Sequence, residues 1–487
     1  MKKLFLKKAA LLLPLLAILG GCTTSEEDYI KVNMTTCSFR GLDASPVTIQ
    51  VNAEPKQWKA EVSGTWIKIV EQTETTLVLN VDDNTDTEER TGEVTLTAGK
   101  AVQTIRVVQI AEHVLQSSYR TYGDYTMGAV VSPNGRYVGG FTAQWDSDVQ
   151  AIVMQVNIVD LRNDKVHLLT PFSSSLYNLY DPCAITDNGD VFFHCEDGRI
   201  VMFNLSDDAV VLNDVPGAKK PWISQVGSDE SGVWVGWAAG GKTVYTPVKW
   251  TNGEAKILPL PEKTFRENKD WLQGGMARGC SHDGKIVYGT TWEGHDSFLM
   301  WWDENDNVRW VSEDLHQVTR VQVLDPNSQT YFDANLVSGV KGTSNSYNIS
   351  PSGRWIAGMY CIEKLSENKI DIEITSCPAF YDTVNDKTYT FPEYHDASGM
   401  TVTDDGIGII GLNAAAGIIT GTHMIDIESG TDLGSTTSWI MNTLGISVPA
   451  DSYVQYITPD KQVVFGYDLN GTGGEAMRMW TVAPKLK

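Results

Sequence analysis

Positive charge is scarce in this sequence: 38 lysines and arginines stand against 61 aspartates and glutamates, which gives a formal net charge of −23. A surface with this excess of acid repels phosphate backbones and anionic lipid headgroups. The sequence therefore argues against a nucleic-acid partner. Long apolar runs are also missing after residue 21, so the body of the chain offers no segment for a membrane-spanning helix.

Familiar catalytic and metal-binding patterns are missing too. The eight histidines are scattered, and the sequence contains neither an HExxH pattern nor a GxSxG nucleophile elbow. Acidic residues are numerous enough to suggest a carboxylate pair for glycoside hydrolysis, but abundance is not geometry. The segment SHDG at residues 281–284 is similar to the Asp-box of sialidases, yet it lacks the residue that this motif places between Asp and Gly. The sequence therefore predicts no catalytic residue and no metal site, and it favours a protein that is not an enzyme.

The N-terminus has the order of a secretory signal. Four lysines among the first eight residues precede an apolar run at residues 9–19, which is too short to cross a bilayer. The run ends in LGGC at residues 19–22, which resembles a bacterial lipobox. The resemblance implies that residues 1–21 are a lipoprotein signal peptide and that Cys22 carries a diacylglyceryl lipid and a further acyl chain such as palmitate. An ordinary signal peptide with an incidental cysteine is the alternative.

Residues 22–29 form a short linker in which Glu26, Glu27 and Asp28 are adjacent. It resembles the acidic tag that directs lipoproteins of some Gram-negative gut bacteria to the outer face of the outer membrane. A plain solvated linker is the alternative. The resemblance implies a lipid-anchored protein of the outer membrane that faces the cell exterior, with no cofactor besides the lipid on Cys22.

Residues 30–112 have the pattern of a small Ig-like β-sandwich. Apolar and polar side chains alternate at residues 47–51, 76–81 and 93–97, with polar turns about every ten residues. The segments QWKA at 57–60, TWIKI at 65–69, RTGEV at 90–94 and IRVVQ at 105–109 resemble, in this order, the pattern of BACON domains. The resemblance implies either carbohydrate or mucin binding, with Trp58 and Trp66 as sugar platforms, or a spacer. The apolar phase around Trp66 favours a core position for that ring.

Residues 113–487 contain an internal repeat, which decides the architecture. Each unit has Ser or Thr, two or three turn residues that usually end in Gly, and then an apolar run. The turns lie at residues 132–135, 186–189, 228–232, 281–284, 350–353, 403–406 and 458–461. Seven units in about 375 residues leave about fifty residues each, the size of a four-stranded propeller blade. The sequence therefore predicts a seven-bladed β-propeller in an all-β chain.

The two ends of the repeat region complement each other. The seventh unit has only one outer strand, at residues 476–482, whereas residues 114–121 form a predicted strand that belongs to no other unit. We expect the two strands to share one blade, which closes the ring and leaves no free sheet edge. In the second turn, Asp187, Asn188 and Asp190 either bind calcium or, as such residues more often do, only form the turn.

Aromatic residues concentrate at one predicted end of the blades. In propellers the innermost strand runs from the upper face to the lower, so the Gly-containing turns are expected below. The long connections 261–277, 313–346 and 435–452 are then expected above, together with aromatic residues at strand ends. Aromatic faces pack against sugar rings, so this set forms the candidate glycan site: Tyr180, Trp222, Trp237, Trp292, Tyr360, Tyr453 and Tyr467. For each residue taken singly, packing between blades is the alternative.

The sequence does not decide whether the cysteines form disulfides or remain free thiols. Besides Cys22 there are six, an even number in an oxidising compartment. Cys361 and Cys377 flank one predicted hairpin, and Cys183 and Cys195 flank another. Each pair either forms a disulfide or consists of buried free thiols.

These observations favour a non-catalytic surface lipoprotein that binds a glycan, or that assists an outer-membrane glycan importer of the TonB-dependent type with its lid lipoprotein. Glycan-utilising gut bacteria carry BACON lipoproteins of this kind, so the resemblance carries much of the hypothesis. Two alternatives remain open because propellers host many functions. One is a polysaccharide lyase or glycoside hydrolase with its site in the propeller mouth, and the other is a scaffold that binds a protein.

Overall fold

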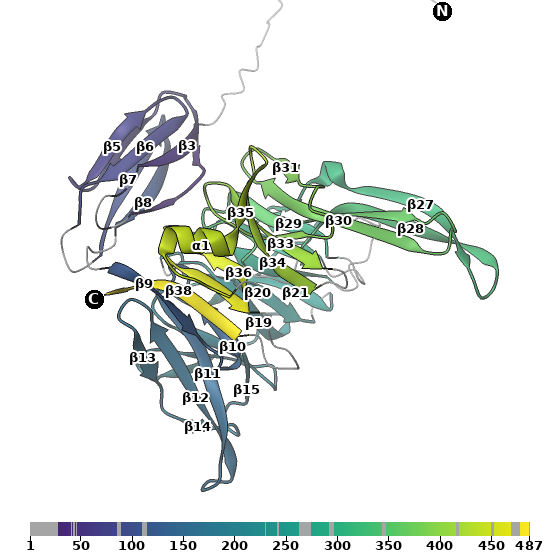
Figure 1. Ribbon diagram of the computed structural model, residues 1–487, viewed down its shortest axis with the longest axis horizontal. Coiled ribbons are helices and arrows are strands. Elements are labelled where there is room, and N and C mark those ends of the chain that lie inside the picture. The colour runs from purple at the N-terminus through teal and green to yellow at the C-terminus, as the bar shows by residue number, and fades with distance from the viewer. Residues whose placement is uncertain are drawn as a thin grey trace, which may run out of the picture.

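The computed structural model describes residues 28–486, except residues 40, 42–43, 45, 85–88, 110–113, 229, 241–242, 263–273, 292–296, 343–346, 415–417, 450–451 and 469–477. The described chain is almost entirely β-structure and forms a sandwich followed by a β-propeller (Figure 1). In this part of the chain, no helix combines the length and apolarity needed to cross a membrane. The predicted signal peptide and Cys22 lie outside the described residues.

The sandwich consists of two four-stranded sheets. One has the order β1 (Tyr29–Val32), β3 (Val47–Glu54), β6 (Thr76–Val81) and β5 (Ile67–Gln72), and the other β2 (Thr36–Phe39), β8 (Ala101–Gln109), β7 (Arg90–Ala98) and β4 (Lys59–Val62). Alternate residues such as Leu77 and Leu79 of β6 are fully buried between the sheets, as the alternating pattern predicts. Trp58 is a core residue whose Nε1 donates to the Glu74 carbonyl at 2.9 Å. The expected core residue Trp66 is only partly buried, beneath the Arg90 guanidinium.

Seven further sheets, called blades 1 to 7 here, follow in sequence order. Blade 1 comprises β10 (Thr126–Val131), β11 (Tyr137–Asp146), β12 (Ala151–Asp160), β13 (Lys165–Leu168) and β14 (Phe172–Ser173); blade 2 comprises β15 (Leu179–Ile185), β16 (Val191–Cys195), β17 (Ile200–Phe203) and β18 (Ala209–Val211). Blade 3 comprises β19 (Lys219–Val226), β20 (Val233–Ala239), β21 (Tyr245–Thr251) and β22 (Glu254–Ile257); blade 4 comprises β23 (Gly275–Cys280), β24 (Val287–Thr291), β25 (Leu299–Trp302) and β26 (Val308–Trp310).

The remaining blades are less regular. A 3-10 helix (Glu313–Leu315) leads into blade 5, which comprises β27 (Gln317–Asp325), β28 (Thr330–Lys341), β29 (Trp355–Leu365), β30 (Ile372–Asp382) and β31 (Lys387–Thr390). Blade 6 comprises β32 (Ser398–Val402), β33 (Ile407–Ala414), β34 (Ile418–Asp426) and β35 (Thr431–Ser435), and α1 (Thr436–Leu444) follows it. Blade 7 comprises β36 (Ser452–Ile457), β37 (Val464–Asp468), β38 (Arg478–Leu486) and β9 (Val114–Thr121).

The repeated turns share one backbone hydrogen bond. In each of the seven turns, the amide of the residue three positions on donates to the carbonyl of the leading Ser or Thr, for example from Gly135 to Ser132 at 2.9 Å. Gly135 has a φ of 70°, a left-handed conformation that glycine adopts at no steric cost. In the seventh turn Lys461 has a φ of 56° at the corresponding position. This geometry is the physical reason for the sequence repeat.

The two ends of the propeller pair as predicted. Strand β9 lies beside β38 in Figure 1, antiparallel, with a register that runs from Trp480 opposite Thr121 to Leu486 opposite Val114. At the start of this ladder, the Tyr122 and Thr481 hydroxyls lie 2.9 Å apart. The N-terminal strand therefore completes the blade that the C-terminal strands begin.

The long connections adopt defined structures where they are described. The connection 313–346 contains the β27–β28 hairpin, which projects from the propeller beside β29 and β30 as an arm (Figure 1). The Leu324 amide donates to the Lys369 carbonyl at 2.7 Å and ties the two hairpins of the arm together. The connection 435–452 contains α1, which is capped by the Ser435 side chain and ends at Gly445 in the left-handed conformation. Most of the connection 261–277 lies outside the described residues.

The lower end of the propeller is blocked at its centre. The Tyr456 hydroxyl of blade 7 donates to the Pro133 carbonyl of blade 1 at 2.6 Å and lies 3.1 Å from Nε2 of His282 in blade 4. Burial lowers the pKa of His282 to about 4, so its ring is neutral at physiological pH. Because blades 4 and 7 are not neighbours in the ring, these contacts cross its centre at the lower end.

The sandwich packs against the same lower face. Arg106 pairs with Glu230 of the blade 3 turn at 3.3 Å, and Glu89 pairs with Arg162 of blade 1. A cavity of about 450 Å³ between the two domains is lined by sandwich residues such as Phe39 and by the turns of blades 6 and 7. The sandwich is therefore in contact with the propeller and does not stand away from it.

Candidate functional site

Four aromatic rings form a row at the upper end of blades 2 and 3. Trp222 near the start of β19 is opposite Trp237 near the end of β20, and their rings stack at 5.3 Å with an interplanar angle of 12°. Tyr245, at the start of β21, meets Trp237 edge-on at 4.9 Å. On the other side, His194 of blade 2 lies 3.3 Å from Trp222 between ring centroids. We call these four residues the aromatic row.

Three of the four rings, Trp222, Trp237 and Tyr245, are partly exposed, whereas His194 is buried. Among the described residues, the cores on either side of blade 3 contain neighbours such as Ile223, Val235 and Ala238, but neither Trp222 nor Trp237. Both indoles keep an intermediate exposure. Tyr180, in the preceding innermost strand, is about half exposed. Packing between blades therefore does not account for the two stacked indoles, in contrast to their core neighbours.

His194 is held by Asp181. Its Nδ1 lies 3.1 Å from the Asp181 carboxylate, which is the cross-strand neighbour of His194 in blade 2. Burial lowers the pKa of His194 although Asp181 opposes this effect, so the imidazole is neutral at physiological pH. Within the described part of the chain, His194 Nε2 and Trp237 Nε1 are buried and have no hydrogen-bond partner. Such groups are costly unless something supplies the missing partner.

The other predicted site residues do not join the aromatic row. Tyr453 is 1% exposed and packs between blades 6 and 7, so its prediction as a binding residue is wrong and the packing alternative holds. Tyr467 is half-buried and lies 4.5 Å from Tyr453 between ring centroids. Tyr360 lies at the base of the arm, where it is paired with Val340 and Cys377. Trp292 lies outside the described residues.

The cysteines do not pair. All six in the described chain are free thiols, and all but Cys183 are buried. Cys361 is opposite Ser376, and Cys377 is opposite Tyr360, so the two side chains project to opposite faces of the sheet. Cys195 is opposite Leu179 and is therefore four residues along the strand from Cys183. Register thus excludes both disulfides and leaves the free-thiol alternative.

The turn aspartates bridge neighbouring blades. Asp187 accepts a hydrogen bond from the Asn134 amide at 2.8 Å, and Asp404 accepts one from the Ser352 amide at 2.7 Å. Burial raises the pKa of Asp404 to about 6. Within the described residues, no three His, Cys, Asp or Glu side chains are grouped as metal ligands. The turn-forming role of Asp187 therefore has a structural basis.

Sequence reasoning missed three members of the site. His194, Asp181 and Tyr245 stand in strands with no motif around them, and their role depends on which blade lies next to them. A weak signal was available, because Asp181 directly follows Tyr180, a predicted site residue, near the start of the innermost strand β15. The charged Arg278 in the innermost strand of blade 4 was also missed.

One family matches part of the chain. Residues 56–110 match the BACON family, described as "Putative binding domain, N-terminal", and this match spans strands β4 to β8 of the sandwich. A comparison with curated protein sequences finds no match.

Several solved structures are similar in fold, among them one β-propeller domain. They include an oligogalacturonate lyase from Vibrio parahaemolyticus (11% identity, 76% of this chain, 98% of that one, TM-score 0.25). The propeller domain of the trilobed protease from Pyrococcus furiosus is similar at 11% identity, over 74% and 94% of the two chains, with a TM-score of 0.30. TolB from Acinetobacter baumannii is similar at 13% identity, over 72% and 80%, with a TM-score of 0.29. Likenesses at this level carry no argument about activity.

Proposed function

We propose that this protein binds a glycan without catalysis and that the aromatic row is the binding surface. The observation that carries the proposal is the stacked pair Trp222 and Trp237, half-buried at the upper end of blade 3 and absent from the blade cores. The axial C–H bonds of a sugar ring pack on an indole face, and its hydroxyls exchange hydrogen bonds with nearby polar side chains. Asp181 and the exposed Tyr180 supply further polar groups at the same edge.

Replacing either stacked indole tests this proposal. We expect Trp222→Ala and Trp237→Ala each to weaken glycan binding by about 1 to 3 kcal/mol, roughly fivefold to a hundredfold, because each removes an aromatic anchor. Thermal stability should fall less, since neither ring is a core residue. A glycan array identifies the ligand, and titration calorimetry on the same proteins measures the loss.

Trp234→Ala is the matched control. Trp234 belongs to the same strand, β20, and is also partly buried, but it packs against Phe192 and the core between blades 2 and 3. This variant should lose stability by about 3 to 5 kcal/mol. If Trp222→Ala and Trp237→Ala behave like Trp234→Ala and only unfold the protein, the aromatic row is blade packing and the proposal fails.

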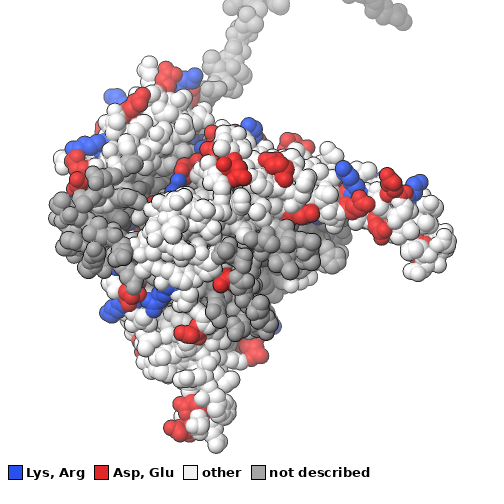
Figure 2. All heavy atoms as spheres, in the orientation of Figure 1, with Lys and Arg blue, Asp and Glu red and all other residues white. Residues whose placement is uncertain are grey.

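The second part of the proposal concerns location. The signal-like residues 1–21, the lipobox-like LGGC and the adjacent acidic residues support an outer-membrane lipoprotein that faces the cell exterior, anchored through Cys22. Acidic side chains outnumber basic ones in the chain and are spread over the face shown in Figure 2. This charge suits a protein held by lipid and not by attraction to anionic headgroups. An importer of the TonB-dependent type with its lid lipoprotein is the proposed partner.

The anchor is tested by one substitution. Cys22→Ala should abolish acylation and move the protein from the membrane fraction into the soluble fraction, because two or three acyl chains are what would hold it at the membrane. Fractionation and fatty-acid labelling measure both effects. A Cys22→Ala protein that stays in washed membranes would contradict the lipid anchor. A Cys37→Ala variant, which removes a buried thiol of the sandwich, should leave the anchor intact.

A further inference from the structure

Arg278 is a mostly buried cation with little to hold it. It is the extra residue of a β-bulge in β23, because Ala277 is opposite Gly289 and Gly279 is opposite Tyr288 on the next strand. Bulges re-aim a side chain at the point where they occur. The corresponding bulges of four other innermost strands hold the uncharged residues Cys183, Ser224, Met400 and Gln455. Blade 4 thus places a positive charge where these blades have none.

The guanidinium of Arg278 lacks an anion. Its Nε donates to the Thr290 hydroxyl at 3.2 Å, and within the described chain it has no carboxylate partner. Burial lowers the pKa of Arg278, although an arginine stays protonated under physiological conditions. A charge removed from water without a partner is unfavourable, so such a residue destabilises the empty protein unless water or a ligand compensates it.

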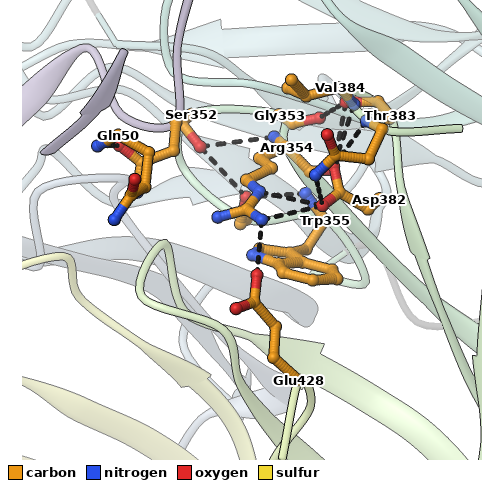
Figure 3. A network of polar contacts seen from close by, with 12 residues as sticks. Gln50, Ser352, Gly353, Arg354, Trp355, Asp382, Thr383, Val384 and Glu428 are labelled. Atoms are coloured by element: carbon orange, nitrogen blue, oxygen red, sulfur yellow. Dashed lines mark hydrogen bonds and ion pairs between the residues drawn. The ribbon is translucent and has the colours of Figure 1, made fainter. Parts of the chain in front are cut away.

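Arg354 is a buried arginine with a structural role, and its contacts differ from those of Arg278. Its guanidinium binds Asp382 Oδ2 through Nε at 3.1 Å and Nη2 at 2.8 Å, and Nη2 also donates to Glu428 at 2.7 Å (Figure 3). It lies over the Trp355 ring as well. Arg136 pairs with Asp160 in blade 1 at the equivalent turn. Arg278 has none of these features, which separates it from the structural arginines.

Arg278 and Trp222 lie on neighbouring innermost strands, β23 and β19, which are joined by a hydrogen bond. Gln225 of β19 accepts a hydrogen bond from the Cys280 amide of β23 at 2.8 Å, which ties the two innermost strands together. Trp222 precedes Gln225 by three residues, and Arg278 precedes Cys280 by two. At about 3.3 Å per residue, both lie within roughly 10 Å of the link along their strands, and both on its upper side. The two backbone positions are therefore close enough for one oligosaccharide to span them.

We propose that Arg278 binds an oxyanion of the ligand and that the glycan bound by this protein is acidic, with uronate carboxylates or sulfate esters. This inference rests on the proposed function and specifies its substrate class. A guanidinium offers parallel N–H donors that match the two oxygens of a carboxylate or sulfate. The net charge of −23 strengthens the argument, because the protein as a whole repels a polyanion. A preference for the acidic form must then come from a local site.

The test compares acidic polysaccharides with their neutral counterparts. Alginate, polygalacturonate and chondroitin are titrated beside their carboxyl-reduced forms, and chondroitin sulfate beside its desulfated form. The wild-type protein should bind at least one acidic member at least tenfold more tightly than its counterpart, and the pair that shows this distinguishes carboxylate from sulfate. Arg278→Gln should lose that preference while it keeps the affinity for the neutral form and melts at or above the wild-type temperature.

Two further variants keep the test decisive. Arg309→Gln makes the same charge change on the exposed outer strand β26 of the same blade, where the guanidinium lies over Trp301, and it should keep the tenfold preference. Arg278→Met removes the charge but fills a similar volume, so it replaces Arg278→Gln if the glutamine variant does not fold. Equal binding of acidic and neutral forms by the wild type, or an unchanged preference in the Arg278 variants, overturns the acidic-ligand inference alone. Binding to neither form of any polysaccharide overturns the proposed function itself.

Discussion

Deletion of residues 114–121 is expected to unfold the whole propeller and not just fray one edge. These residues are strand β9, which supplies the fourth strand of blade 7 and pairs with β38 over its whole length. Without it, β38 becomes a free edge and the ring loses the strand that closes it. Each lost backbone hydrogen bond contributes about 0.5 to 1.5 kcal/mol net, so the deletion removes on the order of 5 kcal/mol, comparable to the stability of a whole domain. Calorimetry or chemical denaturation measures the loss.

Removal of the sandwich alone, residues 30–109, is the control for this deletion. Its recorded ion pairs with the propeller, Arg106 to Glu230 and Glu89 to Arg162, involve partly exposed side chains, and such pairs contribute about 0 to 1 kcal/mol each. The propeller should therefore melt within a few degrees of the intact chain. A propeller that keeps its melting temperature without β9 would show that the ring does not depend on its closure, and the architecture argued here would need revision.

The substitution Arg354→Ala is expected to cost about 3 to 5 kcal/mol of folding free energy, because it leaves a buried carboxylate without its cation. Asp382 is fully buried, and its two oxygens also accept from the Val384 and Asn385 amides and the Asn385 side chain. Those donors remain in the variant, but the positive charge does not. Urea denaturation of the two proteins gives the difference in the free energy of unfolding.

A surface pair provides the comparison for Arg354. Arg199 pairs with Asp197 at 2.6 Å, but both side chains are about half exposed, so Arg199→Ala should cost at most about 1 kcal/mol. The double variant Arg354→Ala, Asp382→Ala should lose less stability than the two single losses combined, because it removes both buried charges. Equal small losses for Arg354→Ala and Arg199→Ala would mean that the network in Figure 3 is not an important source of stability.

The repeat and the closing strand were predictable because both depend on local rules. A turn that needs a left-handed residue selects glycine, and a strand with one buried face alternates, so the turn at residues 132–135 and the alternation of β6 are visible in the residues themselves. The role of the predicted strand at 114–121 followed from counting strands in each unit, since the seventh unit lacked one and this strand belonged to no other unit. The BACON resemblance of the sandwich also rests on local strand patterns.

Side-chain roles were predicted less well because exposure depends on the neighbouring blade. Trp222 and Tyr453 both stand near the start of an innermost strand, and nothing local distinguishes them. Tyr453 is covered by blade 6, whereas Trp222 meets the His194 ring and remains half-buried. The choice between disulfides and free thiols depended on strand register too: Cys361 and Cys377 fall on opposite faces of their sheet, and Cys195 lies four residues along the strand from Cys183.

By itself, the sequence determined the class of the protein: an all-β chain with a BACON-like sandwich, a repeated propeller unit and an acidic surface. These properties depend on the alternation of side chains, on turn residues and on composition. Each of these can be recognised in short stretches of sequence, so no long-range contact has to be known. The tertiary structure alone decided that the sandwich packs against the lower face, that Tyr456 and His282 block the centre, and that Arg278 is left without an anion while Arg354 has two. Each of these depends on residues far apart in the sequence meeting at one place, and burial and charge pairing exist only once the chain has brought them there.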